Sequence, residues 1–148
     1  MTKIEGMQGL LRNLANMKQL PEKEIKALTR RGAGMVLTSA KSKCKNIHVK
    51  NALGFVTKND AKFPMVTLIG VLGGNSKGSK TMTAPALAVI EEFGTAERIK
   101  SNGASTGVYL ARPFMRPAID ENKDKIQDLL TKNLESIILK QAKKNKLI

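Results

Sequence analysis

The sequence predicts a single α+β domain over residues 1–148: a small antiparallel sheet with long N-terminal and C-terminal helices packed on one face. Three observations predict it. Apolar residues recur at helical spacing towards both ends of the chain, two β-rich segments flank a polar turn in the middle, and no internal repeat or domain linker separates them. A chain of 148 residues is long enough for one modest core. Because only 3% of the residues are aromatic, that core must consist mainly of Leu, Ile, Val, Met and Ala.

Two helices are predicted in the N-terminal third. The apolar stripe of the first, which ends near Pro21, is Met7, Leu10, Leu11, Leu14 and Met17. Pro21 and the acidic residues after it open a second helix that runs to about Lys45. The inner stripe of this second helix is Ile25, Leu28, Met35, Val36 and Ala40. Gly32 and Gly34 each weaken it by about 1 kcal/mol relative to Ala, so either another backbone packs closely there or the helix bends.

A β-hairpin is predicted in the middle of the chain. Residues 49–57 alternate in polarity, residues 63–72 are almost continuously apolar and β-branched, and 58–61 form the turn between them. Residues 73–83 and 101–106 are polar loops, and 108–110 have the composition of a further short strand.

A long helix is predicted to close the chain. It starts at Pro117, has Asp120 and Glu121 in its first turn, and ends in a lysine-rich segment, charges that suit the two ends of a helix dipole. Its apolar residues are Ile119, Ile126, Leu130, Leu134, Ile137 and Ile138.

Lys and Arg number 26 against 12 Asp and Glu, a net charge of +14, and the excess lies in the N-terminal half. Such a field attracts polyanions, nucleic acid first. A lysine-rich solvated surface on a small subunit explains the charge equally well. The residues singled out as possible polyanion contacts are Lys23, Lys26 and Arg30. The basic residues lack interleaved aromatics, so any DNA contact should be to phosphates and independent of base sequence.

The sequence does not support catalysis or a cofactor. Residues 73–80 follow a strand and resemble a phosphate-binding loop, but Ser and Lys are transposed relative to the motif and no helix is predicted to follow. His48 is the only histidine and Cys44 the only cysteine, so one chain offers neither a zinc site nor an intrachain disulfide. We therefore expect no enzyme activity, no metal and no cofactor. The N-terminus lacks a secretory pattern and no apolar run approaches about 18 residues, so we expect no membrane segment.

Two motifs near the C-terminus are the most informative part of the chain. Residues 91–95 are Glu-Glu-Phe-Gly-Thr and residues 111–118 are Ala-Arg-Pro-Phe-Met-Arg-Pro-Ala. Pro85 opens a short helix that ends at Gly94, where a left-handed residue is favoured. Acidic residues at that helix end and arginines before the next helix start oppose both helix dipoles, unless Glu91 or Glu92 pairs with Arg112 or Arg116.

Together these motifs resemble the tail-completion, or head–tail joining, family of tailed bacteriophages (gene product ten-like). The order of predicted elements is also similar, so the resemblance extends over nearly the whole chain, although only the two motifs are specific. The motif residues expected to act in assembly are Glu92, Phe93, Gly94, Thr95, Arg112, Pro113, Phe114, Arg116 and Pro117.

The resemblance implies a structural virion protein, made in the host cytoplasm, that forms a ring at the head-proximal end of the tail. It implies a homo-oligomer, a hexameric ring, in contact with the capsid connector or stopper, the tail terminator and the tail tube. Nonspecific contact with packaged DNA is a further expectation from the charge, and a sequence-nonspecific DNA-binding accessory protein is the alternative. For the motif itself we expect Glu92 to pair with Arg112 or Arg116 over Phe93 and Phe114, either within a subunit or across the ring contact.

Overall fold

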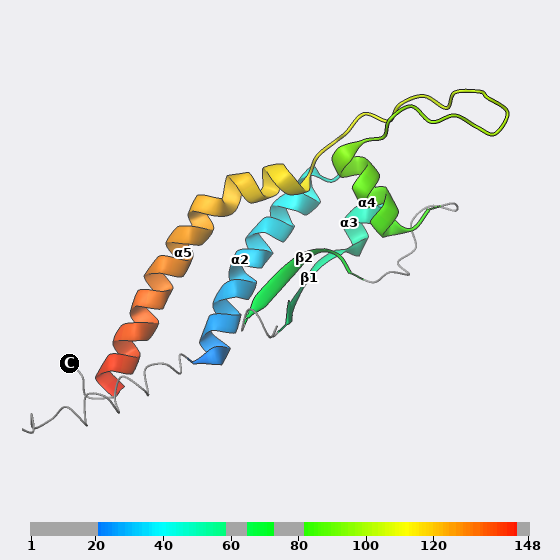
Figure 1. Cartoon of the computed structure of the whole chain (residues 1–148). Helices are drawn as coiled ribbons and strands as arrows, with labels where there is room; N and C mark the ends of the chain where they lie inside the picture. The colour runs from blue at the N-terminus through cyan, green and yellow to red at the C-terminus, as the bar shows by residue number, and fades with distance from the viewer. Residues whose placement is uncertain (1–20, 59–64, 73–81, 145–148) are drawn as a thin grey trace, which may run out of the picture.

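A computed structural model of the chain describes residues 21–58, 65–72 and 82–144 (Figure 1). Its elements are α2 (Glu22–Lys43), α3 (Ile47–Ala52), β1 (Leu53–Lys58), β2 (Val66–Val71), α4 (Ala84–Phe93) and α5 (Met115–Lys144). The predicted α+β class is confirmed: a two-stranded antiparallel hairpin is accompanied by two long helices, which pack together and against the sheet. The predicted helix at 7–17, most of the turn at 58–61 and most of the loop at 73–83 lie outside the described residues.

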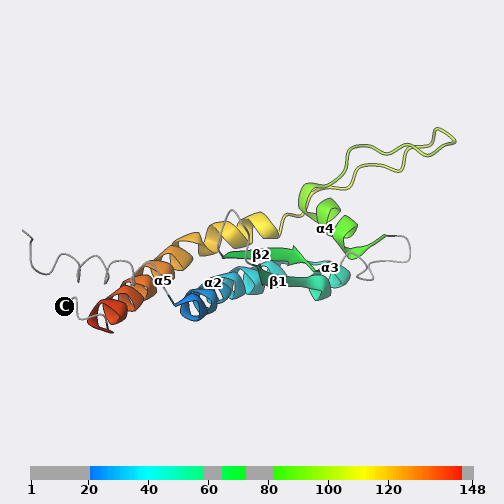
Figure 2. The ribbon, with the colours of Figure 1, turned by 60° about the horizontal axis from the view of Figure 1, so that its bottom comes forward.

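The two long helices run side by side, with the hairpin against α2 (Figures 1 and 2). The buried residues of α2 follow helical spacing; they are Leu28, Gly32, Ala33, Val36 and Ala40. Of the predicted inner stripe, Ile25 and Met35 are only half-buried. Gly32 faces α5, and a Cβ there would stand 3.3 Å from a methyl carbon of Ile126. A Cβ at Gly34 would have nothing within 4 Å. Close packing by α5 therefore explains the first glycine, whereas the second has no neighbour to accommodate.

The hairpin is confirmed, but its first strand is shorter than predicted. β1 and β2 pair in antiparallel register from Leu53 opposite Val71 to Lys58 opposite Val66. Residues 49–52, expected to be the start of this strand, instead belong to α3 (Ile47–Ala52). The reason is local: Asn46 Oδ1 accepts hydrogen bonds from the backbone N–H groups of His48 (3.1 Å) and Val49 (3.4 Å). An Asn side chain that satisfies the first N–H groups is a strong helix start, and it outweighs the β-like alternation of these residues.

The core lies where the hairpin, α2, α3 and the start of α5 meet. Its buried residues come from α2, α3, β1 and the start of α5; they are Val36, Ala40, Cys44, Val49, Leu53, Phe114 and Ala118. The prediction of a core with few aromatic residues is confirmed, since one phenylalanine is buried in this cluster. None of the described helices is long and apolar enough to cross a membrane.

Between α4 and α5 the chain forms a long arm, defined here as residues 95–110, which projects away from the rest of the molecule (Figures 1 and 2). Residues 108–110 lie in this arm and are not a strand of the sheet. α5 begins at Met115, two residues before the predicted start. Pro117 is thus the third helical residue, a position whose N–H lacks an intrahelical acceptor in any case, so proline is tolerated there.

Candidate assembly site

The two sequence motifs meet at one junction, where α4 ends, the arm begins and returns, and α5 starts. α4 has Pro85 in its first turn and Gly94 at its C-cap, as predicted. Gly94 has φ 71°, and a Cβ at this position would stand 2.6 Å from the carbonyl oxygen of Tyr109 and 2.8 Å from the nitrogen of Ala111. Glycine is therefore required at this position for two reasons. Its backbone angle is left-handed, and the returning strand of the arm leaves no room for a side chain.

Glu92 holds the start of α5. Its Oε2 accepts backbone N–H groups from Phe114 (2.8 Å) and Met115 (2.9 Å), and its Oε1 accepts that of Arg116 (3.1 Å). These are N–H groups that a helix start leaves without intrahelical partners, and a negative charge there is favoured by the helix dipole. The carboxylate at the end of α4 is thus the cap of α5, supplied from a residue 22 to 24 positions earlier in the chain.

The electrostatic setting of Glu92 reflects this role. Partial burial is the largest single influence and raises the pKa of the carboxyl group, but the backbone hydrogen bonds from Met115, Phe114 and Arg116 together outweigh it. The net result is a pKa below its ordinary value, with the nearby Arg116 charge as a smaller contribution. Glu92 is therefore held in its charged form by the helix start it caps.

The expected Glu92–arginine pair is not formed within the chain. An ion pair is present elsewhere in the described residues, between Lys43 and Glu121, at 2.5 Å. The Arg116 guanidinium lies 5.2 Å from the centroid of the Phe93 ring, and that of Arg112 lies 5.6 Å from the centroid of the Tyr109 ring. Both arginines stack on exposed or half-exposed rings because the backbone of α5 already occupies the carboxylate.

The expectation that Phe93 and Phe114 pack together beneath the pair is wrong for one of them. Phe114 is 3% exposed and belongs to the core, whereas Phe93 is 61% exposed. Phe93 is the last residue of α4 and Phe114 directly precedes α5. Both line one small cavity of about 160 Å³, but Phe114 is buried in the core whereas Phe93 is mostly exposed.

Glu91 was expected as an alternative partner for the arginines, and it too has a different role. It is buried, and its Oε1 accepts hydrogen bonds from the Tyr109 hydroxyl (2.8 Å) and the Asn46 amide (3.3 Å). Its backbone carbonyl accepts the N–H of Arg112 at 2.6 Å. The hydrogen bond to Glu91 raises the pKa of Tyr109, with burial as the next cause. Sequence reasoning missed Asn46 and Tyr109 altogether, and the one signal for them was the pair of adjacent carboxylates at the end of an apolar helix.

Thr95 completes the root of the arm. Its N–H donates to the carbonyl of Tyr109 (2.9 Å), and its hydroxyl accepts the N–H of Tyr109 (3.1 Å). Each residue of the Glu-Glu-Phe-Gly-Thr motif except Phe93 is thus engaged in fixing where the arm leaves and returns. Beyond this root, all residues from 96 to 108 are exposed.

The three residues predicted as polyanion contacts lie on α2, at the end of the molecule far from the arm (Figure 1). Lys23, Lys26 and Arg30 are all exposed, and the Arg30 guanidinium lies 5.7 Å from the centroid of the Phe55 ring. The structure therefore does not bring them together with the motif residues.

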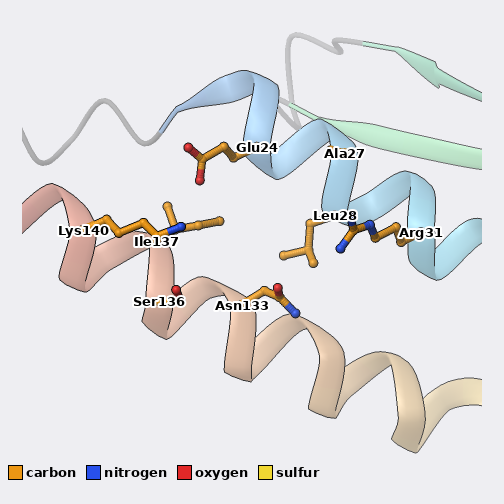
Figure 3. Close-up of a pocket in the computed structure, with 8 residues that line it drawn as sticks. All are labelled: Glu24, Ala27, Leu28, Arg31, Asn133, Ser136, Ile137 and Lys140. Atoms are coloured by element: carbon orange, nitrogen blue, oxygen red, sulfur yellow. The ribbon is translucent and has the colours of Figure 1, made fainter.

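A cavity of about 280 Å³ lies between α2 and α5, away from the junction (Figure 3). Its lining is Glu24, Ala27, Leu28, Arg31, Asn133, Ser136, Ile137 and Lys140. This mixture of opposite charges and apolar side chains lacks a nucleophile with an adjacent base. Within the described residues no group of three or more His, Cys, Asp or Glu side chains could hold a metal ion.

The two residues considered for reactivity lie apart from the cavity. His48 is exposed on α3, and the phosphate-loop-like residues 73–80 lie outside the described residues. Cys44 is a buried free thiol whose pKa is raised, mainly by burial. A thiol of this kind stays protonated and is a packing residue of the core.

Comparisons of the chain with protein-family models, with curated proteins and with solved structures found no match.

Proposed function

We propose that this chain is a structural virion protein of a tailed bacteriophage. It forms a ring at the head-proximal end of the tail, completes the tail and joins it to the capsid connector. The resemblance of its two motifs to the head–tail joining family suggests this function, and implies six copies in the ring and the stopper, terminator and tail tube as neighbours.

The observation that carries the proposal is how the motif residues are used. Glu91, Glu92, Gly94 and Thr95 fix the root of an exposed arm, and the side chains of Glu91, Glu92 and Thr95 bond to backbone groups or side chains of the junction. The large apolar side chains of the arm are exposed; they are Ile99, Val108 and Leu110. A rigid root that presents apolar residues to solvent is suited to association with another protein surface.

A ring requires that each subunit offer different surfaces to its two neighbours, a heterologous contact that closes on itself. The described part of the molecule is elongated, with the arm at one end and the start of α2 and the end of α5 at the other (Figures 1 and 2). Such a shape is compatible with contacts of this type.

The test is to purify virions of the phage that encodes the chain, identify their proteins by mass spectrometry, and locate this one by electron microscopy with a bound antibody. We expect the label at the junction of head and tail, and headless or unjoined tails when the gene is disrupted. Absence of the protein from particles would refute the proposal.

The alternative, a sequence-nonspecific DNA-binding accessory protein, is favoured by the exposed cations on α2. Replacing Lys23, Lys26 and Arg30 with Gln should then lower the salt dependence of DNA affinity by about one unit of slope per lost phosphate contact. A matched control replaces three exposed lysines of α5, Lys123, Lys132 and Lys143. Equal slopes for both triple variants would mean that the α2 cations have no specific part in DNA binding.

A further inference from the structure

We propose that one face of the arm docks on the outer face of α5 in a second copy of this chain. The contact joins Arg98 and Lys100 of the arm to Asp124 and Asp128 of the neighbour. This contact would be the subunit contact of the proposed ring, so the proposal rests on the proposed function.

The arm is a two-stranded ribbon with two different faces. The bridge between Ile99 and Ser105, with the backbone hydrogen bonds from Lys100 to Ala104 and from Thr106 to Arg98, sets one register over residues 98–106. Because alternate residues and cross-strand partners share a face, the even-numbered residues lie together. This face consists of Arg98, Lys100, Ala104 and Thr106, all of them exposed. At Gly107, which has a positive φ of 77°, the regular pairing ends.

This face has two cations, and two large apolar side chains follow it in the returning strand of the arm. Val108 is 58% exposed and Leu110 is 78% exposed. On the opposite face, Ser105 donates to the carboxylate of Glu97 at 2.6 Å, so the acidic residue of the arm is separated from the cations and already bonded. A two-stranded ribbon without a covering layer is marginally stable alone in water, and it gains most from a partner that covers one of its faces.

The outer face of α5 has the complementary charge. Asp120, Asp124 and Asp128 recur every four residues and are exposed, so they form one stripe along the helix. The buried residues of α5, among them Ala118 and Ile137, lie on the other side, against α2. Further along the acidic face lie two large apolar residues, Ile138 and Leu139, 41% and 47% exposed. Lys125 and Lys132 flank the stripe but do not interrupt it.

The spacing of the two sets of charges agrees. Residues two apart on a strand are separated by about 7 Å, which is the spacing of Arg98 and Lys100 along the ribbon. Residues four apart on a helix are separated by about 6 Å along its axis, the spacing of Asp124 and Asp128. The two cations can therefore face two successive carboxylates.

Net charge explains why this contact is specific to one part of a second copy. Two molecules of net charge +14 repel each other, so self-association needs a local region of opposite sign. The stripe on α5 provides that region. In the same chain the arm leads away from α5 in both views (Figures 1 and 2), so the two faces meet between molecules. Since the arm and the helix face are different surfaces, the contact is heterologous, as a ring requires.

A charge swap in the full-length protein tests the proposal. The arm variant carries Arg98→Glu and Lys100→Glu, the helix variant carries Asp124→Lys and Asp128→Lys, and a third protein carries all four changes. A control with Lys45→Glu and Lys50→Glu makes the same change in net charge as the arm variant, at exposed residues outside the contact. The molar mass of each is measured by sedimentation across a concentration series at one ionic strength.

We expect the arm and helix variants each to self-associate at least about tenfold more weakly than the wild type. Mixing the two variants, or combining all four changes, should restore association, and the control should resemble the wild type. A monomeric wild type, or a failure of the swap to restore association, would overturn the proposal. Loss of assembly with purified tails in the arm variant alone would assign the arm to an acidic partner protein instead.

The proposed function is tested separately. If the protein is absent from virions but the charge swap restores association, the subunit contact stands and the virion function is refuted. If the protein is present in virions but the charge swap does not restore association, the virion function stands and the subunit contact is refuted.

Discussion

The root and the tip of the arm come from the same short stretch of sequence, but the side chains of the root are bonded within the chain whereas those towards the tip are exposed. At the root, Glu91, Glu92 and Tyr109 direct their polar atoms to partners within the chain, and Gly94 has no room for a side chain. Towards the tip, charged and apolar side chains alike are exposed, and the hydrogen bonds that residues 96–108 form within the described part of the chain are to one another. The difference indicates that folding energy fixes where the arm points, while the side chains of the arm remain available for another surface.

The same contrast separates the two phenylalanines of the motifs. Phe114 lies in the core and Phe93 on the surface, although a motif-level description treats them alike. The predictions below test this contrast, beginning with the largest expected effect.

Replacing Phe114 with Ala should destabilise the chain by about 3–5 kcal/mol, since it removes a buried aromatic side chain and leaves a cavity. Phe93→Ala, the matched control, should cost less than about 1 kcal/mol because that ring is mostly exposed. Urea unfolding at a concentration where the protein is monomeric measures both. Similar losses for the two variants would show that the junction does not distinguish its two rings.

Gly94→Ala should destabilise by about 2–4 kcal/mol, from the strained positive φ and from the overlap of the new methyl group with the backbone of the returning strand. Gly103 provides the control: its φ of 79° is also positive, but a Cβ there meets nothing within 4 Å. Gly103→Ala should therefore cost only about 1 kcal/mol. If the two variants are destabilised equally, the close approach of the returning strand to Gly94 does not contribute to the cost of the substitution.

Glu92→Gln should cost about 1 kcal/mol at neutral pH, because the cap of α5 loses its charge. The folded-state pKa of Glu92 is below its ordinary value of 4.5, so the stability that its charge provides is present above that value. It is lost as pH falls through the lower folded pKa, so the difference between wild type and variant should shrink over that acidic range. Glu97→Gln, an equal loss of charge on the arm, should cost less than about 0.5 kcal/mol.

The smallest effect is expected from the arginines. In double-mutant cycles of Glu92→Gln with Arg116→Gln and with Arg112→Gln, the coupling in subunit stability should stay below about 0.5 kcal/mol, as for exposed charges that form no ion pair. Coupling above about 1 kcal/mol would contradict the capping geometry described above. Coupling that appears in tail joining but not in subunit stability would place the pair across the ring contact.

Much of the architecture could be predicted from the sequence alone. The fold class, the inner stripe of α2, the hairpin and the break at Gly94 all follow from periodicity and from local backbone preferences, which act over a few neighbouring residues. Where the prediction failed locally, at residues 49–52, two signals competed within one short segment. Alternating polarity indicated a strand, and the Asn46 cap produced a helix.

The candidate site depended on contacts that no local pattern contains. The sequence identified Glu92 as important, and opposite charges suggested an arginine as its partner. Folding instead places the start of α5 against the carboxylate, and three fixed N–H groups with the helix dipole occupy it. Asn46 and Tyr109 reach Glu91 from 45 residues before it and 18 after it. Only the tertiary structure could select these partners, because hydrogen bonds require a position in space that spacing along the chain does not specify.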